Sequence, residues 1–514
     1  MSKIIVLVVV VAITFTFPSF QDRVPSNPDP HPGEALSKQY CGICHLYPDP
    51  SLLDLPTWNN FILPRMGYFL GIYPSDSIRQ SLIETDSSAA KAVENAGIFP
   101  MEPMISLEDW DKILYFYQTN APLKLPEPQF PVVEKNLSLF NVKFPALFLS
   151  PPSSTLVKIA KNGGVYLGDA NTQTIHFLDN QLRHQVKAKV REGAVSLIES
   201  DDDLLVTIMG SFSPTDAALG MILRLPLNPG RQPEVLIDKL QRPVHTSQAD
   251  LDADGLPDLI ISEFGKWTGQ LAWWKQLPGG AFKAYPLRKR SGAIRTIIRD
   301  VNGDGLPDIY GLFGQGDEGI WLYINRGEGK FEEKSILRFP STFGSSFFDI
   351  KDVDGDGVEE ILYTCGDNAD YPPFTKAYHG LRIYKQEAPY IFKEAAFVPL
   401  PGAYSVAARD FDKDGDADLA LISFFPDYEK HPELGFIFME NKGSNVFSYH
   451  TFPQVDAGRW LVMDAGDVDH DGDDDLMLGS LTFEVVPPNP ILEKWVKNGI
   501  PFILLENNRI KGKD

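Results

Sequence analysis

Two segments of the chain share one acidic pattern: Asp250-Leu-Asp252-Ala-Asp254-Gly255-Leu-Pro-Asp258 and Asp300-Val-Asn302-Gly-Asp304-Gly305-Leu-Pro-Asp308. It recurs in Asp352-Val-Asp354-Gly-Asp356-Gly357-Val-Glu-Glu360, Asp410-Phe-Asp412-Lys-Asp414-Gly415-Asp-Ala-Asp418 and Asp467-Val-Asp469-His-Asp471-Gly472-Asp-Asp-Asp475. The first residues of these segments lie 50, 52, 58 and 57 positions apart. A near-constant period of this size is typical of solenoids and propellers. The repeat therefore predicts a ring or stack of similar units.

Each repeat supplies oxygen atoms in the order that a calcium loop needs. Side-chain oxygens stand at positions 1, 3, 5 and 9, position 7 offers a backbone carbonyl, and glycine at position 6 permits a tight turn. An EF-hand would add helices on both sides, whereas the apolar stretches 294–298 and 419–424 predict strands. A water-exposed acidic turn is disfavoured, because two carboxylates ~4 Å apart repel by ~4 kcal/mol at an effective dielectric constant of ~20. We therefore predict about five bound Ca²⁺ ions, which would offset much of the net charge of −22.

The spacing also predicts the number of blades. A strand follows each loop, and an apolar, often aromatic strand comes next, at 271–274, 320–324, 381–384, 435–439 and 502–505. The stretches 157–168 and 195–208 have the same strand, turn, strand layout without a complete loop. Five complete and two loop-free units predict an all-β, seven-bladed β-propeller, with six or eight blades as open alternatives.

The acidic loops and two short signatures, Glu263-Phe264-Gly265 and Leu312-Phe313-Gly314, resemble the FG-GAP repeats of integrin α-chain propellers and related repeat proteins of bacterial exteriors. The resemblance implies a closed ring of blades with calcium in the acidic loops. On this basis the propeller is expected to span residues 140–510.

A second motif lies near the N-terminus. Cys41-Gly-Ile-Cys44-His45 is the attachment signature of c-type cytochromes, in which two thiols bind the porphyrin and the imidazole binds the iron. A thioredoxin-like redox pair is the alternative, but no βαβ unit surrounds Cys41. We therefore predict a covalent haem c held by Cys41, Cys44 and His45.

The flanks of this motif predict a small all-α domain at residues 31–122, joined to the propeller by a Pro-rich linker at 123–139. Residues 33–45 are expected to form its first helix, and 106–119 its last, with Ser106 as the cap. Class I cytochromes c, which this region resembles, end with such a helix packed across the first. For the sixth iron ligand we favour Met66, in a tight loop between Pro64 and Gly67, with Met104 as the alternative and Met101 as a further candidate.

The N-terminal residues predict export. Lys3 precedes the apolar run 4–17, which is shorter than a membrane span and fits a signal peptide within residues 1–20. An uncleaved membrane anchor is the alternative, because the cleavage site is poor. The expected location is periplasmic or extracellular. The net charge of −22 argues against nucleic acid as a partner, because binding phosphates needs a basic face.

A ligand would bind in the central funnel of the propeller. Candidates on strands that lead into the acidic loops are His245, Arg295 and Arg459, and Asp427 lies in a long loop at the other end. The other candidates are polar residues in or near such loops, namely Glu263, Asp317, Asp367, Asn368, Asp370, Tyr371, Lys376, His379 and Glu484. The alternative is that these residues cap strands and hydrogen-bond loop backbone.

Three functions fit the sequence. The chain is an electron-transfer protein whose propeller docks a redox partner, or its propeller is a quinoprotein-like dehydrogenase that feeds the haem, or the propeller is an adhesion module that binds a glycan or protein. The fold cannot decide among them.

Overall fold

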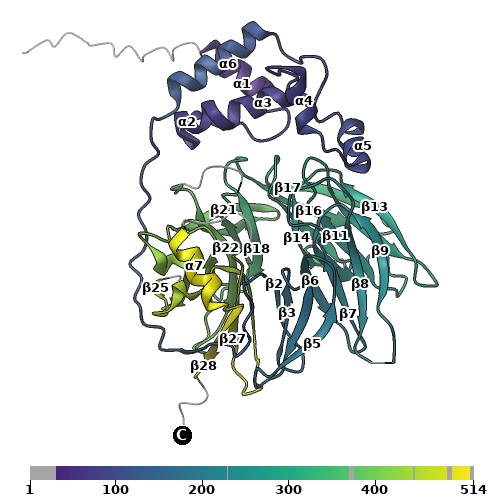
Figure 1. Ribbon diagram of the computed structural model, residues 1–514, viewed down its shortest axis with the longest axis vertical. Helices are drawn as coiled ribbons and strands as arrows, with labels where there is room; N and C mark the ends of the chain where they lie inside the picture. Colours follow the sequence, from purple (N-terminus) through teal and green to yellow (C-terminus); the bar gives the residue numbers. More distant parts are fainter. Residues whose placement is uncertain (1–30, 229, 370–374, 444–445, 483–488, 510–514) are drawn as a thin grey trace, which may run out of the picture.

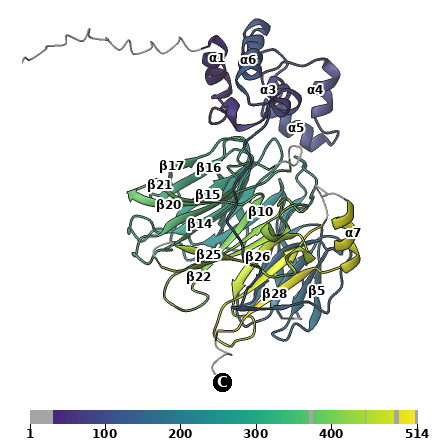
Figure 2. The ribbon, with the colours of Figure 1, turned by 90° about the vertical axis from the view of Figure 1, so that its left-hand side faces the viewer.

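The computed structural model describes residues 31–228, 230–369, 375–443, 446–482 and 489–509. It has two parts, a helical domain and a ring of β-sheets (Figure 1). The view turned by 90° again shows the helical domain over one side of the ring (Figure 2). The predicted order, helices first and sheets after, is confirmed.

The helical domain contains short helices joined by tight turns. None of the helices in the described part of the chain has the length and apolar content that crossing a bilayer requires. The domain comprises α1 (Pro32–Cys41), η1 (Pro50–Leu52), α2 (Leu55–Thr57), η2 (Trp58–Ile62), α3 (Leu63–Phe69), α4 (Asp76–Leu82), α5 (Ser87–Asn95) and α6 (Leu107–Asn120).

The first and last helices cross closely. Ser106 caps α6 as predicted, because its side-chain oxygen accepts a hydrogen bond from the Asp109 N–H at 3.1 Å. At Gly33 of α1 a Cβ atom would lie 2.1 Å from the Lys112 carbonyl oxygen, so only glycine allows the two backbones to approach this far. The crossing expected from the cytochrome-like pattern is therefore present.

The propeller consists of seven four-stranded antiparallel sheets in the described residues, and the prediction of seven blades is confirmed. The first strand of each blade contacts those of the next and previous blades, which closes the ring. From inner to outer strand, blades 1 to 7 are β2 (Ser154–Ile159), β3 (Val165–Asp169), β4 (Thr174–Leu178), β5 (His184–Lys189); β6 (Ala194–Glu199), β7 (Asp203–Ile208), β8 (Gly220–Pro226), β9 (Glu234–Leu240); β10 (Pro243–Ala249), β11 (Asp258–Glu263), β12 (Gln270–Gln276), β13 (Phe282–Arg288); β14 (Ala293–Arg299), β15 (Asp308–Phe313), β16 (Gly319–Asn325), β17 (Phe331–Arg338); β18 (Ser345–Lys351), β19 (Glu360–Cys365), β20 (Gly380–Ala388), β21 (Ile391–Pro399); β22 (Ala403–Arg409), β23 (Asp418–Ser423), β24 (Phe436–Asn441), β25 (Phe447–His450); and β26 (Trp460–Gly466), β27 (Asp475–Ser480), β28 (Phe502–Asn507), β1 (Phe140–Lys143).

Strand β1 closes the ring, because it precedes blade 1 in the chain but forms the outer strand of blade 7. Its register with β28 runs from Phe140 opposite Asn507 to Lys143 opposite Leu504. Blade 7 is therefore built from both ends of the propeller sequence, and this shared blade closes the ring.

The layers of each blade follow from side-chain burial. Every residue of β11, β15, β19, β23 and β27 is buried, since neighbouring blades cover both faces of the second strand. Outer strands such as β13 are largely exposed. The core thus lies between blades, in apolar clusters that span adjacent sheets.

The connecting segment is attached to the ring. The Glu134 N–H donates to the Tyr449 carbonyl at 2.9 Å, and the Thr451 N–H donates to the Glu134 carbonyl at 2.8 Å. Phe130 and Val133 pack against the core of blades 5 and 6. The described elements are completed by α7 (Asn489–Asn498), visible in Figure 1, and by the short turns η3 (Pro432–Gly435) and η4 (Val455–Ala457), all of which lie in connections between strands.

Candidate functional site

The five acidic loops of blades 3 to 7 share one backbone geometry. In the loop of blade 3 the Gly255 N–H donates to the Asp250 carboxylate at 2.8 Å. The same bond from position 6 to position 1 recurs in the other four loops. The glycine at position 6 has a positive φ in all five, for example +83° at Gly255. The tight turn predicted from the sequence is confirmed.

The carboxylate at position 9 is fixed by the strands around it. In blade 4, Asp308 accepts hydrogen bonds from the Val301 N–H at 3.0 Å and from the Asn325 N–H at 2.7 Å. The equivalent carboxylates of blades 3 and 7 are held by two backbone N–H groups in the same way. These bonds place one carboxylate at the base of the loop, below the side chains of positions 1, 3 and 5.

The loops gather carboxylate oxygens at a distance suited to a cation. In each of four loops, ligand atoms of three acidic residues lie within 4.8 Å of one another; blade 4 has Asn302 at position 3. Buried oxygens of Asp252 and Asp418 have no hydrogen-bond partner, and burial together with the Asp412 carboxylate raises the pKa of Asp418 to about 7. A hard, oxygen-preferring cation such as Ca²⁺ fits this donor set.

The cysteine motif lies where α1 ends. Cys41 is the last residue of α1 and is buried, Cys44 is exposed, and both are free thiols. His45 Nδ1 lies 2.8 Å from the Leu46 carbonyl oxygen, which favours a tautomer that leaves Nε2 for a metal. Two unlinked thiols and an oriented imidazole fit a haem c attachment site.

The last helix packs on this motif. The Tyr117 hydroxyl of α6 donates to the Pro48 carbonyl at 2.6 Å, and burial, with Cys44 nearby, raises the pKa of the Cys41 thiol to about 12. Next to these buried groups, Ile43 and Leu46 are 58% and 36% exposed. The apolar side chains in and next to the motif are therefore partly exposed, and a large apolar group such as a porphyrin ring could cover them.

The expected loop around Met66 is not formed, and that part of the prediction is wrong. Met66 lies within helix α3 and packs against the core of the helical domain. Pro64 occupies the first turn of α3, where proline is tolerated, and Gly67 packs on the Trp110 ring. Met104 is 53% exposed. Neither methionine is singled out as the iron ligand.

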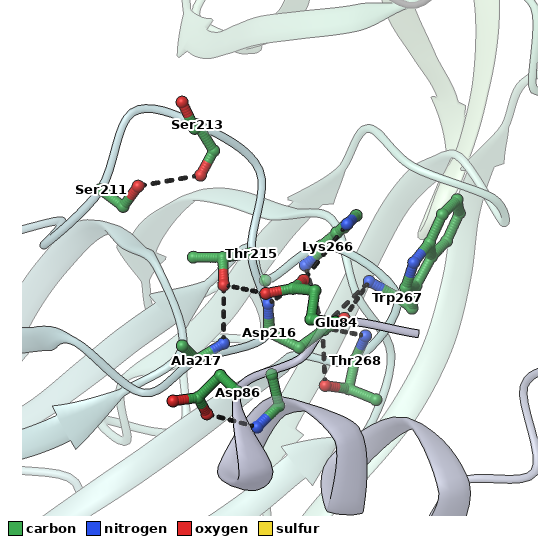
Figure 3. A network of polar contacts seen from close by, with 12 residues as sticks. Glu84, Asp86, Ser211, Ser213, Thr215, Asp216, Ala217, Lys266, Trp267 and Thr268 are labelled. Atoms are coloured by element: carbon green, nitrogen blue, oxygen red, sulfur yellow. Dashed lines mark hydrogen bonds and ion pairs between the residues drawn. The ribbon is translucent and has the colours of Figure 1, made fainter. Parts of the chain in front are cut away.

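The helical domain is docked on the propeller by a polar network (Figure 3). Glu84, from the helical domain, accepts hydrogen bonds from the Thr215 hydroxyl and from the Asp216 N–H at 3.1 Å. The Lys266 ammonium lies 3.2 Å from the same carboxylate. Burial opposes ionisation of Glu84, but these three contacts outweigh it and lower its pKa. No sequence motif reveals this network, because Glu84, the Thr215-Asp216 pair and Lys266 come from three segments far apart in the chain.

Aromatic contacts extend this interface. The ring centroids of Phe69 and Phe99 lie 5.6 and 5.4 Å from that of Trp267, and the Tyr378 hydroxyl donates to the Leu52 carbonyl at 3.1 Å. Trp267 is in the loop at one end of β11, whereas the acidic loop is at the other end. The helical domain therefore sits on the face of the ring opposite the acidic loops.

The cysteine motif faces the propeller within this arrangement. Burial lowers the pKa of His45, and the Asp317 carboxylate and Arg338 guanidinium act on it in opposite directions. Both belong to blade 4, and Arg288 of blade 3 also binds Asp317 at 2.8 Å. Asp317 is thus near the motif, held by arginines.

Two of the funnel candidates come together. His245 and Arg295 hold equivalent register positions on the inner strands β10 and β14, just after the bulge. Burial and the Arg295 charge lower the pKa of His245 to about 3. The Arg295 guanidinium lies over the Phe347 ring at 4.3 Å, and its buried Nε has no hydrogen-bond partner.

The other candidates serve the loops. Arg459 is 1% exposed; its Nε donates to the Phe424 carbonyl at 3.0 Å and its guanidinium stacks on that ring, which agrees with the alternative that it hydrogen-bonds loop backbone. Asp427 accepts from the Lys430 N–H at 3.1 Å in a local turn. Glu263 accepts hydrogen bonds from the Gln241 N–H and from the Gln270 side-chain amide. Lys376 donates to the Asn368 side chain at 2.7 Å. His379 is buried, Asp367 accepts from a backbone N–H two residues ahead, and Asp370, Tyr371 and Glu484 lie outside the described residues.

Comparison with known proteins supports the repeat. The signature described as FG-GAP-like repeat matches residues 250–311 and 300–363, and no curated protein matches. Among solved structures, a streptogramin B lyase is similar over 72% of this chain and 98% of its own, at 14% identity and a TM-score of 0.46. A virginiamycin B lyase from Staphylococcus aureus is similar over 71% and 99%, at 11% identity and 0.44. The WD40 propeller domain of Doa1 is similar over 66% and 94%, at 14% identity and 0.41. The chain carries FG-GAP-like repeats on a seven-bladed β-propeller.

Proposed function

We propose that the chain is an exported c-type cytochrome whose haem domain transfers electrons while the calcium-loaded propeller docks a redox partner or ligand. The observation that carries the proposal is the position of the Cys41 to His45 motif. It ends the first helix, is packed by the last helix, and places His45 close enough to Asp317 and Arg338 of the propeller for their charges to act on the pKa of the imidazole.

The residues of the helical domain have separable roles in this proposal. Cys41 and Cys44 supply thioether bonds and His45 supplies an axial ligand, held in orientation by the Leu46 carbonyl. The bound haem would provide one-electron redox chemistry. The Glu84 network fixes the distance between the motif and the propeller.

Haem attachment is tested by expressing the chain with an intact haem-ligation system. We expect a coloured protein whose tetrapyrrole stays attached through denaturation, and a colourless C41A/C44A variant. C365A is the matched control, because the third cysteine is buried in the propeller and should leave the colour unchanged. A colourless native chain would overturn the proposal.

The distal ligand is tested by single methionine replacements. We expect one of the variants M66A and M104A to abolish the sulfur-to-iron absorption band and the other to leave it in place. If M104A alone abolishes the band, Met104 is the ligand.

Export is part of the proposal, and the N-terminal residues that predict it lie outside the described residues. We expect the chain to be recovered from the periplasm or medium of a bacterial host. Recovery of haem-loaded chain from the cytoplasm would contradict this, because covalent attachment would then occur without export.

The second candidate is a dehydrogenase in which the funnel binds a substrate or quinone-type cofactor. The buried, unpartnered Nε of Arg295 beside His245 favours an anionic ligand at this place. In this case substrates from a broad panel of sugars and alcohols, with pyrroloquinoline quinone added, should reduce the haem of the native chain. The haem of the R295A variant should not be reduced by the same substrates. Absence of reduction with every substrate leaves electron transfer with a docked partner as the function.

A further inference from the structure

The inner strands of blades 3 and 4 carry a basic pair near one end of the ring axis. His245 of β10 pairs with Ser262, and Arg295 of β14 pairs with Leu312, one residue before the ends of β11 and β15. The loops that follow β11 and β15 lie on the side of the helical domain. Both basic side chains are partly exposed. The pair is therefore open to solvent on that side, away from the acidic loops.

Arg295 is a cation held by packing rather than by an acid. Its guanidinium lies 4.3 Å from the centre of the Phe347 ring of blade 5. Among the described residues Arg295 forms no ion pair, and its buried Nε has no hydrogen-bond partner. Folded proteins rarely leave a buried donor unsatisfied. The N–H groups of Arg295 are therefore free to bind an acceptor that the chain itself does not supply.

Two carboxylates of other blades face Arg295 without pairing with it. Burial lowers the pKa of Arg295, and the Asp349 and Asp464 carboxylates act in the opposite direction. Asp464 belongs to blade 7, three blades away, so the Arg295 charge faces across the ring. Asp464 is paired with Lys158 of blade 1 at 2.8 Å. Asp349 accepts a hydrogen bond from the Ile350 N–H at 2.9 Å and forms no ion pair with another described residue.

His245 adds a neutral donor next to the guanidinium. The Thr296 N–H donates to His245 Nδ1 at 3.4 Å, which places the ring proton on Nε2. Burial and the Arg295 charge lower the pKa of His245 to about 3, so the imidazole is neutral at neutral pH. One guanidinium and one imidazole N–H thus stand on adjacent inner strands, and both prefer an anionic oxygen as acceptor.

We propose that Arg295 and His245 bind the carboxylate group of a small organic monoanion on the side of the ring that faces the helical domain. This names the ligand class of the second candidate function and rests on that proposal. The two oxygens of a carboxylate lie in one plane and accept two parallel N–H bonds from a guanidinium. A dianion such as phosphate fits less well, because the Asp349 carboxylate repels the second negative charge.

Isothermal titration calorimetry of the full chain with acetate, benzoate and inorganic phosphate at pH 8 tests the proposal. We expect one saturable site for acetate and for benzoate, and phosphate binding weaker by about tenfold or more. R295A should weaken acetate binding by about tenfold or more, and R295K, which keeps the charge but not the planar fork, by less. H245A should weaken it severalfold. R299A is the matched control, because Arg299 is exposed on the same strand and donates to the Ile298 carbonyl at 3.0 Å.

The native chain alone can overturn the proposal, through the lack of a saturable acetate site or through phosphate binding as tight as that of acetate. Acetate binding by R295A equal to that of the native chain would also overturn it. Circular dichroism checks the fold of each variant, and R295K replaces R295A in the comparison if R295A is unfolded. Haem reduction separates this inference from the second candidate function. If acetate binds but no substrate reduces the haem, the carboxylate site stands and the dehydrogenase function falls; reduction without an acetate site overturns the carboxylate site alone.

Discussion

Blades 1 and 2 have no acidic loop, whereas blades 3 to 7 each have one, yet all seven form the same four-stranded sheet with a bulge in the inner strand. In blade 1 the loop is replaced by a turn at Gly163 and Gly164, both with positive φ. The sheet is therefore specified by burial between neighbouring blades and by β1 closing the ring. The acidic loops are additions that must be neutralised.

Calcium removal should separate the two groups of blades most strongly. We expect chelation to lower the melting temperature of the propeller by many degrees, because each ion bound at ~1,000 times its Kd contributes about 4 kcal/mol. Differential scanning calorimetry with and without a chelator measures the effect. Hydrogen exchange should rise first at β22–β28 and least in blades 1 and 2.

The helical domain is the internal control in that experiment. Its core, formed around Trp58, Ile113 and Tyr117, is separate from the acidic loops. We expect its own transition and any haem absorbance to persist. An unchanged melt of the whole chain after exhaustive chelation would contradict metal-filled loops.

Glu318 is a buried carboxylate of the propeller outside the acidic loops. The variant E318Q therefore tests how the ring stabilises a buried carboxylate by protonation. Burial raises the pKa of Glu318 from 4.5 to about 8, although its side chain accepts a hydrogen bond from the Ser345 N–H at 2.9 Å. The native chain should lose stability as the pH rises from 4.5 towards 8, because the folded state holds the proton more tightly than the unfolded state. In the native chain this loss of unfolding free energy should amount to about 1.4 kcal/mol per unit of pKa shift, and E318Q should lack it.

Urea unfolding at pH 5 and pH 9 measures this difference. The two proteins should be similar at pH 5, and the variant should be more stable at pH 9. E333Q is the control, since Glu333 is partly exposed and paired with Arg288. Equal pH dependence in native chain and E318Q would contradict a protonated Glu318.

Among the described residues, asparagines at the ends of third strands join neighbouring acidic loops in blades 4, 6 and 7. Asn507 Nδ2 donates to the Phe411 carbonyl of the blade 6 loop at 2.9 Å, and Asn325 donates to the Leu251 carbonyl at 2.8 Å. N507A should cost about 1–3 kcal/mol, because two buried carbonyls lose a donor. N171A, on the exposed surface of blade 1, should change stability by less than about 0.5 kcal/mol. Denaturant titration compares the two.

Features that recur in the sequence, such as the acidic loops, were predicted from it, whereas contacts that occur only once were not. The periodic aspartates and glycines predicted the loops, the strands and the number of blades, because the same residue pattern recurs in each loop-bearing unit. The ion pairs of Lys275 and Lys385 with loop aspartates depend on strand register. Arg459 was placed in the funnel because a basic residue before an inner strand gives no sign of the Phe424 ring that buries it.

The helical domain shows the same limit. Its capped last helix follows from local residues, and the structure agrees. The segment around Met66 is helical, and Gly67 within it packs against Trp110, a contact that sequence spacing does not reveal. The partners of an interdomain contact such as Glu84 with Lys266 lie 182 residues apart in the chain and belong to no motif.

The docking face should respond to pH but not to calcium, and E84Q tests this with the smallest expected effect. Because the pKa of Glu84 is lowered from 4.5, its contribution is present above pH 4.5 and is lost as the pH falls through the lowered value. The carboxylate is partly exposed, so its charge contributes only about 0.5–1 kcal/mol. We expect E84Q to speed proteolytic cleavage within residues 121–131 severalfold at neutral pH, to remove the acid-induced increase, and to leave the calcium count unchanged. E94Q, on the exposed side of α5, is the control. If E84Q is cleaved like the native chain at both pH values, the Trp267 ring contacts and the Tyr378–Leu52 hydrogen bond hold the helical domain in place without the Glu84 charge.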